Sequence, residues 1–269
     1  MTKIHPTAII HSSAQLAEGV EVGPYTLIGE DVVIGPNTWL GPHCVVEHAR
    51  IGRDNKIHAG ACLGTPPQDF KYNGEPTLLI LGDKNIVREY VTLNRGTTTG
   101  KTVIGNECMF MAYSHVGHDC RVGNGLVLVN SAALAGHVEV GDNTIIGGMA
   151  GIHQFARIGS LVMLGAGAMA GLDIPPFCTA QGDRAKIVGL NLIGMRRAGI
   201  GREGVSSVKE AFKTLFSSGW TMKEAVEKLK SEPMTSQVAL MVDFIEKTKR
   251  GITGLRKSVP EEEEEPVSV

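Results

Sequence analysis

Four histidines and one aspartate in the middle of the chain are the residues best suited to chemistry: His115, His118, Asp119, His137 and His153. A neutral imidazole, whose ordinary pKa is about 6.5, can remove a proton from a substrate hydroxyl. A carboxylate beside it can hold the ring in one tautomer and one orientation. His118, followed directly by Asp119, therefore predicts a general base with an orienting partner.

The elements that could position these side chains are indicated by an aliphatic residue at every sixth position. One series is Ile4, Ile10, Leu16, Val22, Ile28, Ile34 and Leu40, and a second is Ile104, Phe110, Val116, Val122, Leu128, Leu134, Val140, Ile146, Ile152, Ile158 and Leu164. Neither the 3.6-residue period of a helix nor the alternation of a strand gives this spacing, whereas a hexapeptide β-helix does. We therefore predict a mainly β protein built as a parallel β-helix.

The repeat, aliphatic-Gly-x-x-small-x, resembles that of the hexapeptide-repeat acyltransferases. This resemblance implies that three hexads, eighteen residues, make each coil of a left-handed triangular prism. With that coil length, His118, Gly136 and Gln154 share one column, and Asp119 and His137 share the next. Gly136 has no side chain, so its amide could approach a substrate oxygen closely and stabilise a developing negative charge.

The domain organisation follows from where the six-residue phase stops. Interruptions near residues 64–79 and 94–103 predict two loops that leave the prism, and such loops commonly carry function. We predict a β-helix over residues 1–190, a small α-helical domain over 191–258, and a disordered acidic tail over 259–269. The expected helices are 202–218, one that starts with the capping box Thr221-x-x-Glu224, and 236–250.

Composition excludes several classes of function. The formal charge of −2 and the pI of about 6.5 give no basic field for nucleic acid, although residues 192–259 carry a local excess of Lys and Arg. No stretch of the chain is apolar enough to span a membrane, and there is no apolar leader, so a cytoplasmic location is expected. Five cysteines without a CxxC motif argue against a disulfide framework or a zinc ribbon.

A more specific resemblance rests on several segments of the chain. These are 114–120 (SHVGHDC), 134–138 (LAGHV), 152–155 (IHQF), 68–72 (QDFKY) and 180–197. They closely resemble the UDP-N-acetylglucosamine 3-O-acyltransferases of lipid A biosynthesis, along most of the chain. The resemblance implies transfer of a (R)-3-hydroxyacyl group from acyl carrier protein to the 3-hydroxyl of UDP-N-acetylglucosamine by a homotrimer, without a cofactor or a metal.

Residue roles are implied by the same resemblance. His118 would be the general base, Asp119 its orienting partner and Gly136 the oxyanion donor. Contacts with the sugar, the acyl chain or the nucleotide are expected from Gln68, Asp69, Lys71, His115, His137, His153 and Gln154, and contacts with the uridine diphosphate from Asn191 and Arg197. Because the loop that carries Asp69 leaves the prism several coils before His118, we expect neighbouring subunits to complete each site.

Three positions qualify this resemblance. Ile193 stands where many family members have a glutamate, and Ala198 stands where they have a second arginine, so the nucleotide contacts near Asn191 and Arg197 depart from the family pattern. Ala166 corresponds to the position that gates the acyl groove in the family. Alanine there predicts a somewhat shorter acyl chain than glycine would admit.

Other functions are compatible with the same residues. The acceptor could carry a 3-amino group, which would make the product an amide. A coenzyme A-dependent acetyl- or succinyltransferase would keep the fold and change the donor. A zinc enzyme like the γ-class carbonic anhydrases could use the clustered histidines as ligands. A purely structural β-helix is the remaining alternative.

Overall fold

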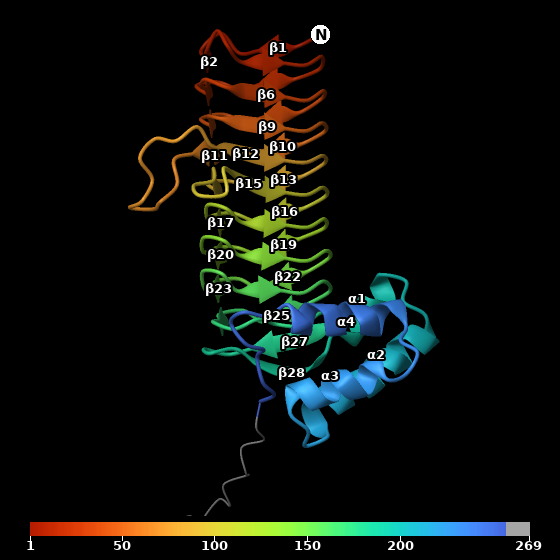
Figure 1. Cartoon of the computed structure of the whole chain (residues 1–269). Coiled ribbons are helices and arrows are strands. Elements are labelled where there is room, and N and C mark those ends of the chain that lie inside the picture. Colours follow the sequence, from red (N-terminus) through yellow and green to blue (C-terminus); the bar gives the residue numbers. More distant parts are fainter. Residues whose placement is uncertain (257–269) are drawn as a thin grey trace, which may run out of the picture.

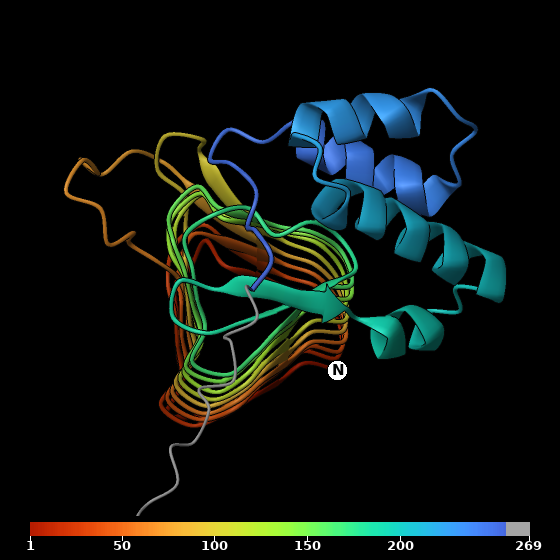
Figure 2. The same ribbon diagram turned by 90° about the horizontal axis from the view of Figure 1, so that it is seen from below.

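The computed structural model describes residues 1–256 as a parallel β-helix with a group of helices at one end (Figure 1). Viewed along its axis, the β-helix is a triangular prism with a sheet on each side (Figure 2). Successive coils pair with a register of eighteen residues, such as Met109 with Val127 and Val127 with Ile145. The predicted hexapeptide β-helix is thereby confirmed, while the acidic tail predicted for 259–269 lies outside the described residues.

Three sheets of eleven, nine and eight strands form the prism, and all pairs are parallel except the last one, β27 with β28. The first sheet contains β1 (Lys3–Ile4), β4 (Glu21–Val22), β7 (Trp39–Leu40), β10 (Lys56–Ile57), β13 (Ile86–Val87), β16 (Met109–Phe110), β19 (Val127–Leu128), β22 (Ile145–Ile146), β25 (Met163–Leu164), β27 (Cys178–Gln181) and β28 (Lys186–Leu190). The second contains β2 (Ile9–Ile10), β5 (Leu27–Ile28), β8 (Val45–Val46), β11 (Cys62–Thr65), β14 (Thr92–Asn94), β17 (His115–Val116), β20 (Ala133–Leu134), β23 (Gly151–Ile152) and β26 (Met169–Ala170). The third contains β3 (Gln15–Leu16), β6 (Val32–Ile34), β9 (Ala49–Ile51), β12 (Leu78–Leu81), β15 (Lys101–Ile104), β18 (Arg121–Val122), β21 (Glu139–Val140) and β24 (Arg157–Ile158).

The core of the prism consists of the residues that the period selects. Every member of the second aliphatic series is buried, and so are the compact residues four positions later, including Cys108 and Cys120. Burial raises the pKa of the Cys120 thiol to about 12, so this cysteine is a core residue without nucleophilic character. Ile4, by contrast, is half exposed, because no coil covers the N-terminal end of the prism.

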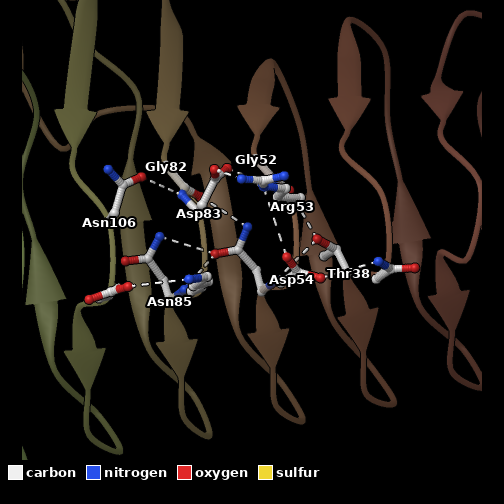
Figure 3. Close-up of polar contacts among 12 residues, drawn as sticks. Thr38, Gly52, Arg53, Asp54, Gly82, Asp83, Asn85 and Asn106 are labelled. Atoms are coloured by element: carbon white, nitrogen blue, oxygen red, sulfur yellow. Dashed lines mark hydrogen bonds and ion pairs between the residues drawn. The ribbon is translucent and has the colours of Figure 1, made fainter.

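A ladder of polar side chains supports one corner of the prism (Figure 3). Asp83 accepts a hydrogen bond from the Arg53 amide at 2.9 Å, and Asn106 accepts one from the Asp83 amide at 2.7 Å. A parallel inner ladder is fully buried, where Asn55 Oδ1 accepts from both the amide and Nδ2 of Asn85. These side chains satisfy backbone groups at turns that the strand ladders do not reach.

The inner ladder predicts a stability difference between two asparagines. Asn85 Oδ1 accepts a hydrogen bond from the Cys108 amide at 2.9 Å. Asn85→Ala removes this acceptor and leaves buried polar groups without partners. We expect a loss of about 1–3 kcal/mol, measured by thermal or denaturant unfolding. Asn106→Ala is the matched control, because Asn106 is exposed and water can replace its bonds. Equal losses for the two variants would contradict the importance of burial.

Two loops leave the prism near one corner (Figure 2). The first connects β11 with β12 and the second connects β14 with β15, at the two interruptions of the sequence period. The long first loop projects well away from the prism in Figure 1, where it is coloured orange. Gly64, where this loop departs, has φ of +71°, and a Cβ there would lie 1.8 Å from the carbonyl oxygen of Glu47. Only glycine fits this departure point.

Between β28 and residue 256, the structure has four helices: α1 (Leu192–Arg197), α2 (Arg202–Ser217), α3 (Met222–Lys230) and α4 (Ser236–Glu246). They share a second hydrophobic core that includes Met195, Val208 and Met241. The capping box predicted at Thr221 and Glu224 is present. The helix predicted over 236–250 ends earlier, at Glu246.

The early end of α4 has a physical cause in the bonds of the residues that follow it. Thr248 donates to the buried carboxylate of Asp173, and Arg250 donates to the Gly171 carbonyl. The Asp173 amide in turn donates to Gly251, which returns the chain to the end of the prism. These contacts with the β-helix replace the last helical turn that the sequence suggested.

Candidate active site

A groove of about 840 Å³ runs along the face formed by the ends of β14, β17, β20, β23 and β26. Its floor is apolar and includes Leu134, Ile152 and Ala170, which belong to consecutive coils. Polar side chains stand along its rim, among them His115, His118, His153, Gln154 and Gln68. The groove therefore combines an apolar track with a concentration of groups that can transfer protons.

His118 is held by a network that starts at the adjacent carboxylate. Its Nδ1 lies 2.8 Å from Asp119 Oδ2, and the His118 residue is only 7% exposed. Asp119 in turn accepts hydrogen bonds from the amides and hydroxyls of both Thr97 and Thr99, in the loop between β14 and β15. The ring of His118 is thus fixed through a carboxylate that is itself fixed.

The protonation of this pair follows from its contacts. Burial alone would raise the pKa of Asp119, but hydrogen bonds from Thr97, Thr99 and His118 outweigh burial and hold that pKa well below its ordinary value. An ionised Asp119 only accepts hydrogen bonds, so His118 Nδ1 must carry a proton. In the neutral ring, Nε2 then has the free lone pair, and Nε2 lies on the side of Gly136 and Asp69. The arrangement provides a base at Nε2.

His137 packs against His118 from the next coil. The two rings meet edge to face with centroids 5.2 Å apart, and His137 stacks on Phe155 at 4.6 Å. His137 Nε2 lies 3.5 Å from Asp119 Oδ2. Burial is the largest effect on the pKa of His137 and lowers it, while Asp119 acts in the opposite direction. His137 is accordingly a neutral donor at physiological pH.

His115 and His153 occupy the rim of the groove. His115 Nδ1 lies 2.7 Å from the Thr92 hydroxyl, and burial, reinforced by His118, lowers the pKa of His115. His153 Nδ1 lies 3.0 Å from the carbonyl oxygen of Gln154. Both rings keep one nitrogen free for a ligand in the groove.

Gly136 lies directly against the ring of His118. A Cβ at Gly136 would be 2.5 Å from both Cε1 and Nε2 of His118, so any side chain would displace the imidazole. Within residues 1–256, the Gly136 amide has no hydrogen-bond acceptor. The free amide is therefore available to a ligand atom beside the proposed base, as the column arithmetic predicts.

The first loop reaches the site within one chain. Asp69 Oδ2 lies 4.0 Å from His118 Nε2, and Gln68 lines the groove. Asp69 therefore reaches His118 without a neighbouring subunit, and the expectation that neighbouring subunits complete each site stays a prediction for the other contacts. Lys71 is exposed on the same loop.

Sequence relatives decide which family this arrangement represents. The acyl-[acyl-carrier-protein]–UDP-N-acetylglucosamine O-acyltransferase of Stenotrophomonas maltophilia (strain K279a) is 48% identical over 253 residues, which cover 92% of this chain and 96% of the relative. The protein of the same name from Aliarcobacter butzleri is 43% identical and covers 96% of this chain and 100% of the relative. The chain belongs to the UDP-N-acetylglucosamine O-acyltransferase family. It is an acyltransferase.

Solved structures and family models agree with this assignment. LpxA from Acinetobacter baumannii has a TM-score of 0.91 and 41% identity, with coverage of 93% of this chain and 99% of that one. The UDP-N-acetylglucosamine acyltransferase from Campylobacter jejuni has a TM-score of 0.90 and 39% identity, with coverage of 94% and 100%. Residues 173–253 match the second domain of UDP-N-acetylglucosamine O-acyltransferases, and residues 31–65 match bacterial transferase hexapeptide repeats.

Three residues expected in the acyltransferase site lie away from the groove of their own chain. Asn191 caps α1, where its Oδ1 accepts from the Gly194 amide and its Nδ2 donates to the Leu161 carbonyl. One lone pair and one N–H of Asn191 remain for a ligand. Arg197 is exposed at the end of α1, and Ala166 is exposed in the turn between β25 and β26.

Sequence reasoning missed several residues that the structure brings to the acyltransferase site. Thr97 and Thr99 hold Asp119, and Arg184 and Lys186 line one end of the groove. The Gly/Thr-rich loop was recognised as a break in the period, but the break itself does not say which hydroxyl reaches which carboxylate. Within residues 1–256, no helix is long and apolar enough to cross a bilayer.

Metal binding is the chemistry that this donor set could also suggest. His118, Asp119 and His137 have ligand atoms within 4.8 Å of one another. However, both oxygens of Asp119 already accept hydrogen bonds from Thr97 and Thr99, and a metal would have to displace them. The contacts of Asp119 match an orienting carboxylate better than a zinc ligand, whose remaining lone pairs would face the metal.

Proposed function

We propose that this acyltransferase moves a (R)-3-hydroxyacyl group from acyl carrier protein to the 3-hydroxyl of UDP-N-acetylglucosamine, the first step of lipid A biosynthesis. The observation that carries the proposal is the position of His118 Nε2. It lies beside the free amide of Gly136 on an apolar groove, while Asp119 occupies the opposite nitrogen. The names of the relatives, all O-acyltransferases that act with acyl carrier protein and UDP-N-acetylglucosamine, support the same substrates.

The proposed mechanism needs no covalent intermediate with the enzyme, because a thioester is already activated. His118 Nε2 takes the proton of the sugar hydroxyl as that oxygen attacks the thioester carbonyl. The Gly136 amide donates to the oxyanion that forms. When the tetrahedral intermediate collapses, the C–S bond breaks and the proton on Nε2 passes to the departing sulfur. Asp119 stabilises the imidazolium of His118 while it carries that proton.

The other polar residues are proposed to bind substrate. Asp69 lies close enough to His118 to contact the sugar near the reacting hydroxyl. Gln68, His115, His153 and Gln154 line the groove and would contact the sugar or the acyl carbonyl, while the neutral His137 would donate a hydrogen bond. Lys71 is proposed to contact polar atoms of the nucleotide.

A left-handed β-helix that assembles as a homotrimer completes the proposal. Asn191, Arg197 and Ala166 lie away from the groove of their own chain, so a neighbouring subunit is the natural source of contacts with the nucleotide and with the end of the acyl chain. The helical region over 191–258 would serve as a small domain of each subunit and add basic residues for the acidic carrier protein. The cytoplasmic location expected from the sequence stays a prediction.

The proposed function is tested by product formation from UDP-N-acetylglucosamine with a panel of 3-hydroxyacyl carrier proteins. We expect turnover with the carrier thioesters, none with short-chain coenzyme A thioesters, and no loss of turnover after removal of metals with a chelator. A preference for the longest acyl chains would contradict the proposed effect of Ala166. Turnover with only a 3-amino sugar nucleotide, or chelator-sensitive activity, would replace the proposal with the amide-forming or zinc-dependent alternative.

A further inference from the structure

Arg95 is a buried arginine between the two loops that leave the prism. It follows β14 at the start of the second loop, and its residue is only 8% exposed. Its Nη1 donates to the Gly64 carbonyl at 2.9 Å, at the point where the first loop departs. Its Nε and Nη2 both donate to the hydroxyl of Tyr72, at 3.2 and 3.0 Å, near the far side of that loop. Arg95 thus bonds both to the strand end from which the first loop departs and to a residue within that loop.

Most of the first loop has little other contact with the prism. Phe70, Lys71 and Asn73 are exposed. Within the loop, the Tyr72 amide donates to the Asp69 carbonyl at 3.1 Å, and the Lys71 amide donates to Asp69 Oδ1 at 3.0 Å. The segment from Asp69 to Tyr72 is therefore a hydrogen-bonded turn, and the Tyr72 hydroxyl joins this turn to the buried Arg95.

The second loop links Arg95 to the other side of the catalytic ring. Thr97, two residues after Arg95, donates to Asp119, which orients His118 Nδ1. The first loop places Asp69 within 4.0 Å of His118 Nε2. Arg95 thus lies between two loops. The second loop holds Asp119 against His118 Nδ1, and the first loop brings Asp69 near His118 Nε2.

Burying a guanidinium is costly unless its donors are satisfied, so a position that keeps one requires an explanation. Glu47 Oε2, at 3.6 Å from Arg95 Nη1, supplies the opposite charge, and Gly64 and Tyr72 supply the acceptors. Gly64 lies at the end of β11, where the loop departs, and Tyr72 lies within the loop. The arrangement fixes the loop at a defined height above the groove.

We propose that Arg95 and Tyr72 are positioning residues that latch the 66–77 loop over the groove and so set the place of Asp69 relative to His118. This inference rests on the proposed function for its kinetic consequence, but the latch itself is a property of the chain. Opening the latch leaves His118, Asp119 and Gly136 in place and removes Asp69 from the acceptor sugar. Opening the latch therefore raises the KM for the sugar nucleotide and lowers kcat, while binding of the acyl carrier protein is unaffected.

The decisive experiment is a double-mutant cycle between Tyr72 and Asp69. Tyr72→Phe removes the hydroxyl that accepts from Arg95, together with its bond to the exposed Glu75 carbonyl, which water can replace. We expect kcat/KM for UDP-N-acetylglucosamine to fall about 10- to 100-fold, the loss of hydrogen bonds to a charged group. In an Asp69→Ala background, the same change should have an effect of less than about twofold, because coupled residues are non-additive. Tyr25→Phe, an exposed tyrosine far along the prism, is the matched control. Independent losses at Tyr72 and Asp69 would overturn the latch.

Hydrogen exchange separates this inference from the proposed reaction. Tyr72→Phe and Arg95→Lys should accelerate amide exchange in the 66–77 loop and leave the coils of β17, β20 and β23 unchanged. This measurement requires no substrate, so it reports on the latch even if native enzyme shows no turnover with any donor, which would count against the proposed function alone. Unchanged exchange in the loop would overturn the latch whatever the kinetics.

Discussion

His118→Ala is expected to reduce kcat/KM for acyl transfer by about 10²–10⁴-fold, the contribution of a positioned general base. The reason is that His118 Nε2 is the nitrogen left free beside Gly136, while Nδ1 is engaged by Asp119. The measurement is initial-rate kinetics with UDP-N-acetylglucosamine and the best carrier thioester from the donor panel. The KM for the sugar nucleotide should change far less than kcat.

The control for this change is His43→Ala, which removes an imidazole that stacks on Tyr25 far from the groove. Its activity should equal that of the native enzyme. Unfolding of His118→Ala should occur within a few degrees of native, because its ring lies on the groove and outside the hydrophobic core. If His118→Ala retained turnover within about tenfold of native, His118 would not be the general base.

Asp119→Asn is expected to reduce kcat by a similar factor and also to destabilise the fold. The amide cannot accept from both threonines and from His118 Nδ1, so the ring loses the tautomer that leaves Nε2 free. In a Ser-His-Asp triad the same replacement lowers kcat by about 10⁴. The unmatched donors of Thr97 and Thr99 should cost about 1–3 kcal/mol of unfolding free energy.

The pH dependence of this stability loss has a defined sign. The folded-state pKa of Asp119 lies below the ordinary value of 3.8, so its stabilisation is complete above that value and is lost as the pH falls toward the folded pKa. Native protein and Asp119→Asn should therefore differ by a constant amount near neutral pH and converge in strong acid. Denaturant unfolding at a series of pH values makes the measurement. A difference that grows as the pH falls would show that Asp119 is not held ionised in the folded enzyme.

The predicted fold rests on a signal that is repeated along the chain. Aliphatic residues such as Val116 and Leu134 occupy the same place in successive coils and are buried there. The same spacing therefore recurs many times, and it can be recognised in the sequence without tertiary information. The departure at α4 illustrates the opposite case. The basic residues within 247–250 and the following Gly251 are typical of a helix end near residue 250. However, Thr248 and Arg250 bind the end of the prism, and local propensity does not include that competition.

The contact between His118 and Asp119, the proposed base and its carboxylate, could be predicted because its geometry is local or periodic. His118 and Asp119 are adjacent, and Gly136 follows His118 by one coil, so a fixed repeat carries them into contact. The position of Asp69 could not be obtained in this way. The loop that carries it leaves the repeat, and counting coils along the axis does not give the path of such a loop.

The sequence by itself determined the hexapeptide β-helix, because periodic burial of aliphatic residues fixes every position within a hexad. The resemblance to the acyltransferases supplied the eighteen-residue coil, and the adjacency of His118 and Asp119 suggested the proposed base with its carboxylate. The tertiary structure alone decided which partners hold them. Thr97 and Thr99 reach Asp119, and Arg95 reaches Tyr72, across loops that have no period. Their positions depend on satisfying buried charges, and that requirement is met only when distant segments are folded against one another.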